Sequence, residues 1–226
     1  LLKEKFDLGL FENPYVDVEN ALKIVGNKEA VASADLALRK SIVLLRNDQK
    51  VLPLAKKTKV YFETYFNTGR NKDFIKVSKP NYPEFEFVST KEEADVILLW
   101  LIPNGGGLFS SQGAKIDLRL STNRIDVIHV NELIESKPTI VAINYTNPWV
   151  IEEIDKGKTR GIIATFGTTQ EALLDIVSGK FKPTGKMPFT TPKNMQAVEA
   201  NKSDVPGYLE GPDYGLFIFG QPIMGT

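Results

Sequence analysis

The sequence predicts an α/β fold, namely a three-layer α/β sandwich with a mainly parallel central sheet, preceded by an extended linker. Three stretches are continuously apolar instead of alternating: residues 95–102, 139–144 and 161–165. Continuous apolar character is typical of strands that are covered on both faces, as in a parallel sheet. Helix-like segments lie between these stretches, and a repeated strand-then-helix order favours parallel pairing.

The composition excludes several classes of protein. Of the 226 residues, 42% are hydrophobic and 25% are charged, which is typical of a folded globular domain and not of a disordered or fibrous chain. The 28 basic and 28 acidic residues cancel, so the net charge offers no attraction to nucleic acid or to an anionic membrane. The longest apolar run, residues 96–102, is far too short to span a bilayer. We therefore expect no nucleic-acid partner and no membrane partner.

The reactive residue types are few. The chain has no cysteine, which excludes thiol catalysis, thiolate zinc sites and disulfides. Its single histidine, His129, excludes a site with several histidine ligands and makes a Ser–His–Asp triad possible only through that residue. We expect no metal and no cofactor.

Residues 1–26 are expected to form an extended linker, because Gly9 and Pro14 interrupt them among scattered aromatic residues. We place the domain itself at residues 27–226. From about residue 190 prolines and glycines return, which predicts an irregular tail.

The first elements of the domain follow in order. Asn27 can cap a helix over residues 28–40, a stretch rich in alanine, leucine and charged residues. A short apolar strand over residues 41–45 comes next, and a second strand begins near residue 59.

Helices are predicted between the later strands. Residues 123–135 carry apolar side chains at helical spacing. Pro148 suits the first position of a further short helix. The motif Thr168-x-x-Glu171 is typical of a capping box, and Gly179 is expected to end the helix that this box begins.

A glycine-rich loop, residues 104–107, follows the most apolar strand. In open α/β sheets, ligands bind at loops beyond the carboxyl ends of strands. A dinucleotide-binding loop would need G-x-G-x-x-G leading directly into a helix. Here Ser110 takes the third position, and residues 116–120 alternate like a strand. A substrate-facing loop and a plain surface loop both remain open.

The other polar candidates are a histidine, three carboxylates and three residues beyond the last apolar strand. They are His129, Glu152, Glu153, Asp155, Thr168, Thr169 and Gln170. Each has a sufficient structural explanation: a solvated helix histidine, acidic residues near a helix amino end, and helix caps. They form no catalytic constellation by themselves.

Four stretches resemble, in the right order, the C-terminal domain of glycoside hydrolase family 3, the β-glucosidase and β-N-acetylglucosaminidase group. They are KFDLGLFENPY (5–15), KSIVLLRN with VLPL (40–54), GKFKPTGKMPF (179–189) and YGL (214–216). The resemblance implies an N-terminal (β/α)8-type barrel in the same parent protein, a carbohydrate substrate, and secretion or a periplasmic location. It also implies that Phe6, Leu10, Phe11 and Tyr15 face that barrel, so that they expose apolar surface here.

Retaining hydrolysis, which the resemblance implies, needs one carboxylate as nucleophile and another group as acid. In this family the barrel supplies the nucleophile, and many β-glucosidases take the acid, a glutamate, from a loop of the C-terminal domain. The corresponding loop, residues 104–115, contains no carboxylate, and its Gln112 cannot act as an acid. The residues expected near the substrate are Asn104, Ser110, Ser111 and Gln112.

The missing carboxylate has three explanations. The domain is non-catalytic, or Asp117 is a displaced acid, or the parent belongs to the N-acetylglucosaminidase branch, which uses a His–Asp pair on a barrel loop. We favour the third, with hydrolysis of terminal β-linked N-acetylglucosaminyl residues; the alternatives are a β-glucosidase or β-xylosidase domain and a structural or interaction module. We expect no catalytic residue in this chain, which alone should be inactive.

Overall fold

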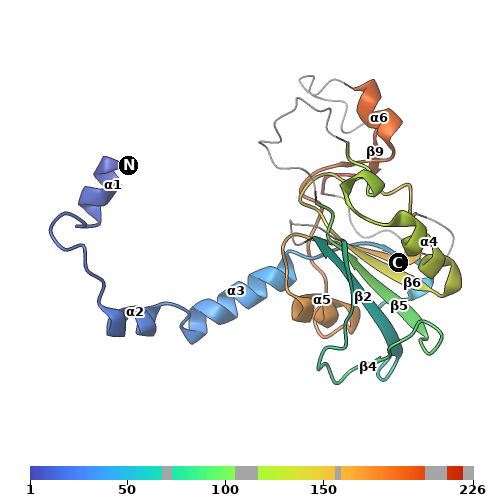
Figure 1. Ribbon diagram of the computed structural model, residues 1–226, viewed down its shortest axis with the longest axis horizontal. Helices are drawn as coiled ribbons and strands as arrows, with labels where there is room; N and C mark the ends of the chain where they lie inside the picture. The colour runs from blue at the N-terminus through green and yellow to red at the C-terminus, as the bar shows by residue number, and fades with distance from the viewer. Residues whose placement is uncertain (68–72, 105–116, 156–158, 202–212, 221–226) are drawn as a thin grey trace. The chain divides into compact units, whose positions relative to one another are not determined.

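The computed structural model describes residues 1–67, 73–104, 117–155, 159–201 and 213–220 (Figure 1). The chain divides into two units, Leu1–Ala37 and Leu38–Thr226. Among the helices that the structure describes, none has the length and apolar character needed to cross a membrane.

Two short helices, α1 (Leu2–Asp7) and α2 (Val18–Ile24), lie where an extended linker was expected. Most of α3 (Lys28–Lys40), which was predicted as a helix, also falls in the first unit. The expectation of an extended segment was wrong at these residues. A local cap supports α2, where the Asp17 carboxylate accepts from the Asn20 backbone N–H. Asn27 caps α3 as predicted, accepting from the Ala30 N–H at 2.9 Å.

This first unit exposes apolar side chains. The three helices, all fully described, contain no buried residue. Phe6 and Phe11 are more than half exposed, with ring centroids 4.6 Å apart, and Tyr15 is 84% exposed. Exposed aromatic side chains of this kind are typical of an interaction surface.

The second unit is built on one sheet in the order β1-β7-β6-β5-β2-β3, with β4 also paired to β2. The strands are β1 (Val43–Asn47), β2 (Lys59–Asn67), β3 (Asp73–Val77), β4 (Glu86–Phe87), β5 (Val96–Leu101), β6 (Thr139–Asn144) and β7 (Thr159–Thr165). The strands β2, β5, β6 and β7 pair in parallel, and the outer strands β1 and β3 are antiparallel to their neighbours. The prediction of a mainly parallel sheet is confirmed.

Helices cover both faces of this sheet, α4 (Val127–Ser136) one face and α5 (Gln170–Val177) the other (Figure 1). All six residues of β5 are buried, and they divide alternately between the two cores. Trp100 packs with α5, whereas Leu99 and Leu101 pack with α4. The three-layer arrangement is thereby confirmed, with β5 inside the sheet as its apolar run predicts.

The helix predicted after Pro148 is absent from this described stretch. Trp149 is buried, and its indole N–H donates to the Asn144 carbonyl at 2.9 Å. The Val150 N–H donates to the Leu118 carbonyl, so this backbone forms a bridge with the segment around Arg119. The burial of Trp149 and the long-range backbone hydrogen bond of Val150 outweigh the local preference of Pro148 for the start of a helix.

Two further predictions near the C-terminus need adjustment. Thr169, not Thr168, caps α5, accepting from the Ala172 N–H. Gly179 follows the helix at a positive φ of 77°, as expected for a helix end. The tail is more regular than expected, because β8 (Thr191–Pro192) and β9 (Gly215–Phe217) form a small antiparallel sheet.

The remaining described elements are the 3₁₀ turns η1 (Asp48–Lys50) and η2 (Ser121–Asn123) and the helix α6 (Met195–Ala200).

Candidate functional site

The carboxyl ends of the parallel strands meet at one edge of the sheet, where an open α/β sheet binds its ligands. Polar groups join the strands there. The Trp100 indole N–H donates to Thr165 Oγ1 at 3.2 Å, and the Gly167 backbone N–H donates to Asn144 Oδ1 at 2.8 Å. We call this the carboxyl edge, and it is the candidate site.

The glycine-rich loop leaves β5 at the carboxyl edge. Asn104 is exposed there, and its backbone N–H donates to the Asn123 carbonyl at 3.1 Å. The other expected substrate-proximal residues, Ser110, Ser111 and Gln112, lie outside the described residues.

Asp117, the candidate displaced acid, forms an ion pair with Arg119. The Arg119 Nε–H lies 3.0 and 3.1 Å from the two carboxylate oxygens, and Nη2 contacts Oδ2 as well. These hydrogen bonds and the guanidinium charge lower the pKa of Asp117 to about 2. A general acid needs a pKa near the working pH. Asp117 is therefore ionised at neutral pH and is poorly suited to protonate a leaving group.

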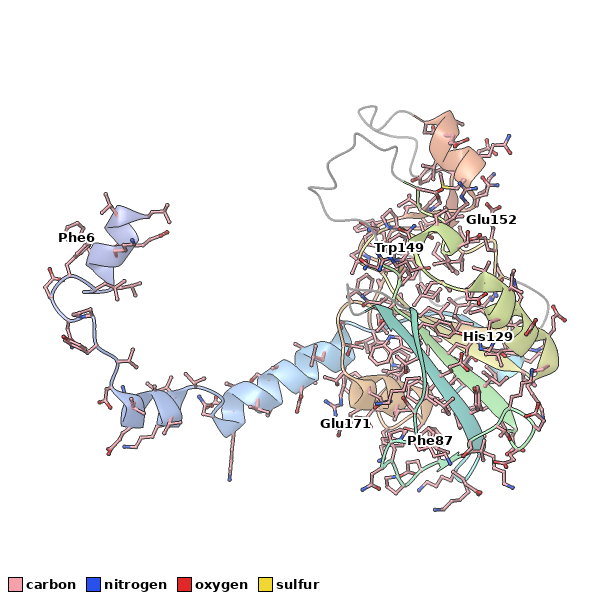
Figure 2. All side chains as sticks on the ribbon, in the orientation of Figure 1. Phe6, Phe87, His129, Trp149, Glu152 and Glu171 are labelled. Carbon is pink, nitrogen blue, oxygen red and sulfur yellow. The ribbon has the colours of Figure 1, made fainter. Side chains whose placement is uncertain are left out.

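His129 does not project freely into solvent, so the interpretation of a solvated helix histidine was wrong (Figure 2). Its Nε2 lies 2.9 Å from Oε1 of Glu63, which is completely buried in β2. The Tyr61 hydroxyl donates to the other carboxylate oxygen at 2.6 Å. The sequence carries a signal for this group, a glutamate beside the apolar residues Val60-Tyr61-Phe62, but Glu63 was not among the predicted site residues.

This buried group lies away from the carboxyl edge. Glu63 is opposite Leu99, in the middle of β5, and His129 stands on α4 above that face. The group therefore joins a helix to the sheet, and its position gives it a structural role.

The carboxylates beyond β6 each have a partner inside the domain. Glu153 accepts from the backbone N–H and the hydroxyl of Ser121. Asp155 accepts from Arg46 at 2.5 Å, and Glu152 (labelled in Figure 2) accepts from a backbone N–H at 3.4 Å. They organise loops, so their role is structural, but the helix whose amino end was expected to favour them is absent from these described residues.

The three residues beyond β7 are also structural. The Thr168 hydroxyl donates to the Leu38 carbonyl at 3.1 Å, Thr169 caps α5, and Gln170 begins that helix. Over the described residues, no three histidine or acidic side chains gather to hold a metal ion.

An aromatic cluster at the carboxyl edge was missed by the sequence analysis. Phe166 follows β7, Tyr145 follows β6, and both rings pack with Phe189, at centroid distances of 6.1 to 6.4 Å. Burial raises the pKa of the Tyr145 phenol. Phe189 belongs to the GKMPF motif, so the cluster connects that motif to the carboxyl edge.

Comparison with known proteins assigns the family. The profile described as "Glycosyl hydrolase family 3 C-terminal domain" matches residues 78–221. The chain belongs to this family. As a family 3 C-terminal domain it is 39% identical, over 94% of its length, to "Beta-glucosidase C" of Emericella nidulans. It is 30% identical, over 97% of its length, to the "Periplasmic beta-glucosidase/beta-xylosidase" of Dickeya chrysanthemi.

Solved structures show the same fold. The β-glucosidase of Listeria innocua matches 98% of this family 3 C-terminal domain with a TM-score of 0.69 at 21% identity, and the match covers 38% of that chain. A family 3 β-glucosidase of Neurospora crassa matches 87% with a TM-score of 0.63 at 14% identity, covering 32% of that chain. The chain likewise spans about a third of the curated relatives, 33% and 32% of the two named above.

Proposed function

We propose that this chain is the C-terminal domain of a family 3 β-glucosidase or β-xylosidase, in which it packs against a catalytic barrel. The carboxyl edge, with Asn104 and the loop that follows it, helps to shape the sugar pocket. The observation that carries this proposal is the 39% identity over 94% of the chain to a β-glucosidase.

The relatives favour a β-glucosidase or β-xylosidase over the N-acetylglucosaminidase that the sequence predicted. The expected N-acetylglucosaminyl substrate rested on the absence of a carboxylate from residues 104–115. The relatives lend this no support, because they carry β-glucosidase and β-xylosidase names. Since Asp117 is held as an ion pair, we infer that the proton donor of the parent protein lies outside the described residues of this domain.

The proposal also includes a partner and a location. The exposed aromatic surface of the first unit, around Phe6 and Phe11, suits an apolar contact with the barrel. A secreted or periplasmic location is supported by the Dickeya chrysanthemi relative, which is named as periplasmic.

The test is an assay of the parent protein on nitrophenyl β-glucoside, β-xyloside and N-acetyl-β-glucosaminide, side by side. We expect the glucoside or the xyloside to be hydrolysed at least about tenfold faster than the aminosugar, a difference of about 1.4 kcal/mol in transition-state binding. Faster hydrolysis of the N-acetyl-β-glucosaminide would contradict this proposal and support the predicted N-acetylglucosaminidase instead. Hydrolysis of none of them would favour a non-catalytic module.

The isolated 226-residue chain is the matched control. A retaining glycosidase needs two positioned groups, and the described residues offer no pair of free carboxylates at the carboxyl edge. The isolated chain should therefore show no turnover above a contaminant control. Turnover by this chain would mean that the domain holds its own catalytic pair.

A further inference from the structure

Asn144, the last residue of β6, is fixed at the carboxyl edge by three hydrogen bonds. Its side-chain Oδ1 accepts from the Gly167 backbone N–H at 2.8 Å. Its backbone carbonyl accepts from the Trp149 indole N–H at 2.9 Å and from the Thr146 N–H at 3.1 Å. Because an N–H must meet the oxygen of an amide and not its nitrogen, the bond from Gly167 also determines where the Asn144 Nδ2 group lies.

The Nδ2 group of Asn144 is a donor with two N–H bonds to give. Within the part of the chain that the structure describes, no hydrogen bond joins it to another residue. The Asn144 residue is only 8% exposed. The enclosed polar atoms that lack a partner include Thr64 Oγ1 but not Asn144 Nδ2, so the free amide reaches the surface of the carboxyl edge.

Asn144 belongs to a layer of buried hydrogen-bonding side chains that ends the sheet on its α5 face. This polar layer takes one residue from each parallel strand: Thr64 (β2), Trp100 (β5), Asn144 (β6) and Thr165 (β7). The layer before it, two residues earlier in each strand, is apolar: Phe62, Leu98, Ala142 and Ile163. Apolar walls with a few fixed polar groups are typical of sites that bind small molecules.

We propose that Asn144 is a substrate-binding residue, whose side-chain amide donates a hydrogen bond to a hydroxyl group of the sugar. The hydroxyl oxygen is a neutral acceptor, which suits an uncharged amide in a largely buried position. Because Gly167 already holds the Asn144 side chain, little conformational entropy is lost when the sugar binds. This inference rests on the proposed function, since it takes the carboxyl edge to face the sugar pocket.

The proposed contact predicts a dependence on one hydroxyl of the sugar. Removing the Asn144 amide should weaken binding only of sugars that carry its partner hydroxyl. A general disturbance of the domain would instead weaken the binding of every sugar by the same factor. Comparing sugars that each lack one hydroxyl therefore separates a direct contact from a structural effect, by the logic of a double-mutant cycle.

Two substitutions remove the donor. Asn144→Leu leaves neither a donor nor an acceptor, and Asn144→Asp keeps an acceptor for the Gly167 N–H, so that its local structure should be preserved. The second variant keeps the test decisive if the first does not fold.

The chain offers a matched control in Asn47. It is also 8% exposed, but its amide is fully used within the domain: Nδ2 donates to the Leu52 carbonyl and Oδ1 accepts from the Leu52 N–H, both at 2.9 Å. Asn47 pairs with Gly161, in the amino-terminal half of β7 and away from the carboxyl edge. The same substitutions there test the cost of changing a buried asparagine outside the candidate site.

The experiment is an equilibrium titration of the parent protein with glucose and with the glucoses that each lack one hydroxyl, or with the xylose series if the parent prefers the xyloside. We expect Asn144→Leu to weaken glucose binding about fivefold, which corresponds to one hydrogen bond of about 1 kcal/mol. For one deoxy sugar the affinity should be unchanged. Asn47→Leu should lower the melting temperature and leave every affinity unchanged.

For Asn144→Asp, the ratio of variant to wild-type affinity for one deoxy sugar must differ from the ratio shared by the other sugars. A ratio common to all sugars in the folded Asn144 variants, including a ratio of one, would overturn the inference. An equal loss of glucose affinity in Asn47→Leu would also overturn it.

The titration needs no turnover, so the two proposals fail separately. If the parent hydrolyses a glycoside but the Asn144 variants show a common ratio for all sugars, the inference fails and the proposed function stands. If the expected pattern is found in a parent that hydrolyses no glycoside, Asn144 binds sugar and the proposed function fails. If the parent binds neither glucose nor xylose, the inference fails.

Discussion

The Nε2 atom of His129 on α4 lies 2.9 Å from Oε1 of Glu63, a carboxylate that is completely buried in β2. The second oxygen of Glu63 accepts from the Tyr61 hydroxyl at 2.6 Å. A buried carboxylate is costly unless it is paired and hydrogen-bonded. The single histidine of the chain therefore serves to satisfy a charge in the core and to join α4 to the sheet.

Replacing His129 with alanine should lower the free energy of unfolding by about 1–3 kcal/mol, because it leaves one oxygen of the buried carboxylate without its partner. The expected loss of stability is smaller than for a fully buried pair, because the His129 side chain is 35% exposed. Urea denaturation measures the change.

Two further variants test the cause of that loss. Ile128→Ala, at a neighbouring side chain that is 73% exposed, should change stability by less than about 0.5 kcal/mol. Glu63→Gln should lower the free energy of unfolding less in the His129→Ala background than in the wild type. In that background the Glu63 carboxylate has already lost its histidine partner, and glutamine removes the unpaired charge. Strictly additive effects would contradict the pairing.

Asp117→Asn should reveal an acid-dependent contribution to stability. The pKa of Asp117 is lowered to about 2 by Arg119, so the ion pair stabilises the folded state above the unfolded-state pKa, about 4, and this contribution is lost as the pH falls towards 2. At neutral pH the wild type should be more stable by less than about 1 kcal/mol, because solvent screens this exposed pair. Denaturation from pH 7 to pH 2 measures the difference, and one that grows on acidification would contradict it.

Tyr82 should make the domain sensitive to alkali. Its hydroxyl donates to the buried Asp175 at 2.8 Å, and burial followed by the nearby carboxylate raises its pKa to about 12. Its contribution to stability is present below the unfolded-state pKa, about 10, and is lost as the pH rises through 12. Tyr82→Phe should be about 1 kcal/mol less stable than the wild type at neutral pH.

The difference between wild type and Tyr82→Phe should shrink between pH 10 and pH 12, where only the wild type has this phenol to ionise. Denaturant unfolding at several alkaline pH values measures it. A gap that stays constant over this range would mean that the Tyr82 phenol does not titrate as its surroundings require.

Gly185→Ala should destabilise the domain by about 1–3 kcal/mol through overpacking. A Cβ at Gly185 would lie 2.7 Å from the Ile42 carbonyl oxygen, a backbone atom that cannot easily move aside. Gly161→Ala is the matched control, because a Cβ there would meet its nearest atom, on Ile140, at 3.4 Å, close to ordinary contact. Thermal melting should show a large loss for the first and a small one for the second; equal losses would refute the close-approach argument.

The apolar runs were sufficient to predict the three central strands β5, β6 and β7. Residues 139–144 are a strand with the predicted bounds, and residues 95–102 contain β5 inside the sheet. Helix α3 likewise begins and ends where its composition and the Asn27 cap indicated. Periodicity and capping are local properties, and they were readable because the local preference and the tertiary environment agree.

The candidate site was less predictable. The position of Asn104 after β5 followed from the strand order, but the hydrogen bonds that Asn123 makes with Asp117 and Asn104 depend on how separate turns meet in space. The helix expected after Pro148 failed for the same reason, since burial of Trp149 outweighed a local signal.

The sequence by itself determined the class of fold, the central parallel strands, helix α3 and the family resemblance, because these depend on patterns within short segments. Only the tertiary structure decided the roles of the polar side chains. It placed His129 against Glu63, 66 residues apart in the chain, and it turned Asp117 from a candidate acid into a partner of Arg119. The charge state and reach of a side chain depend on its neighbours in space, and those neighbours are set by the packing of the whole domain.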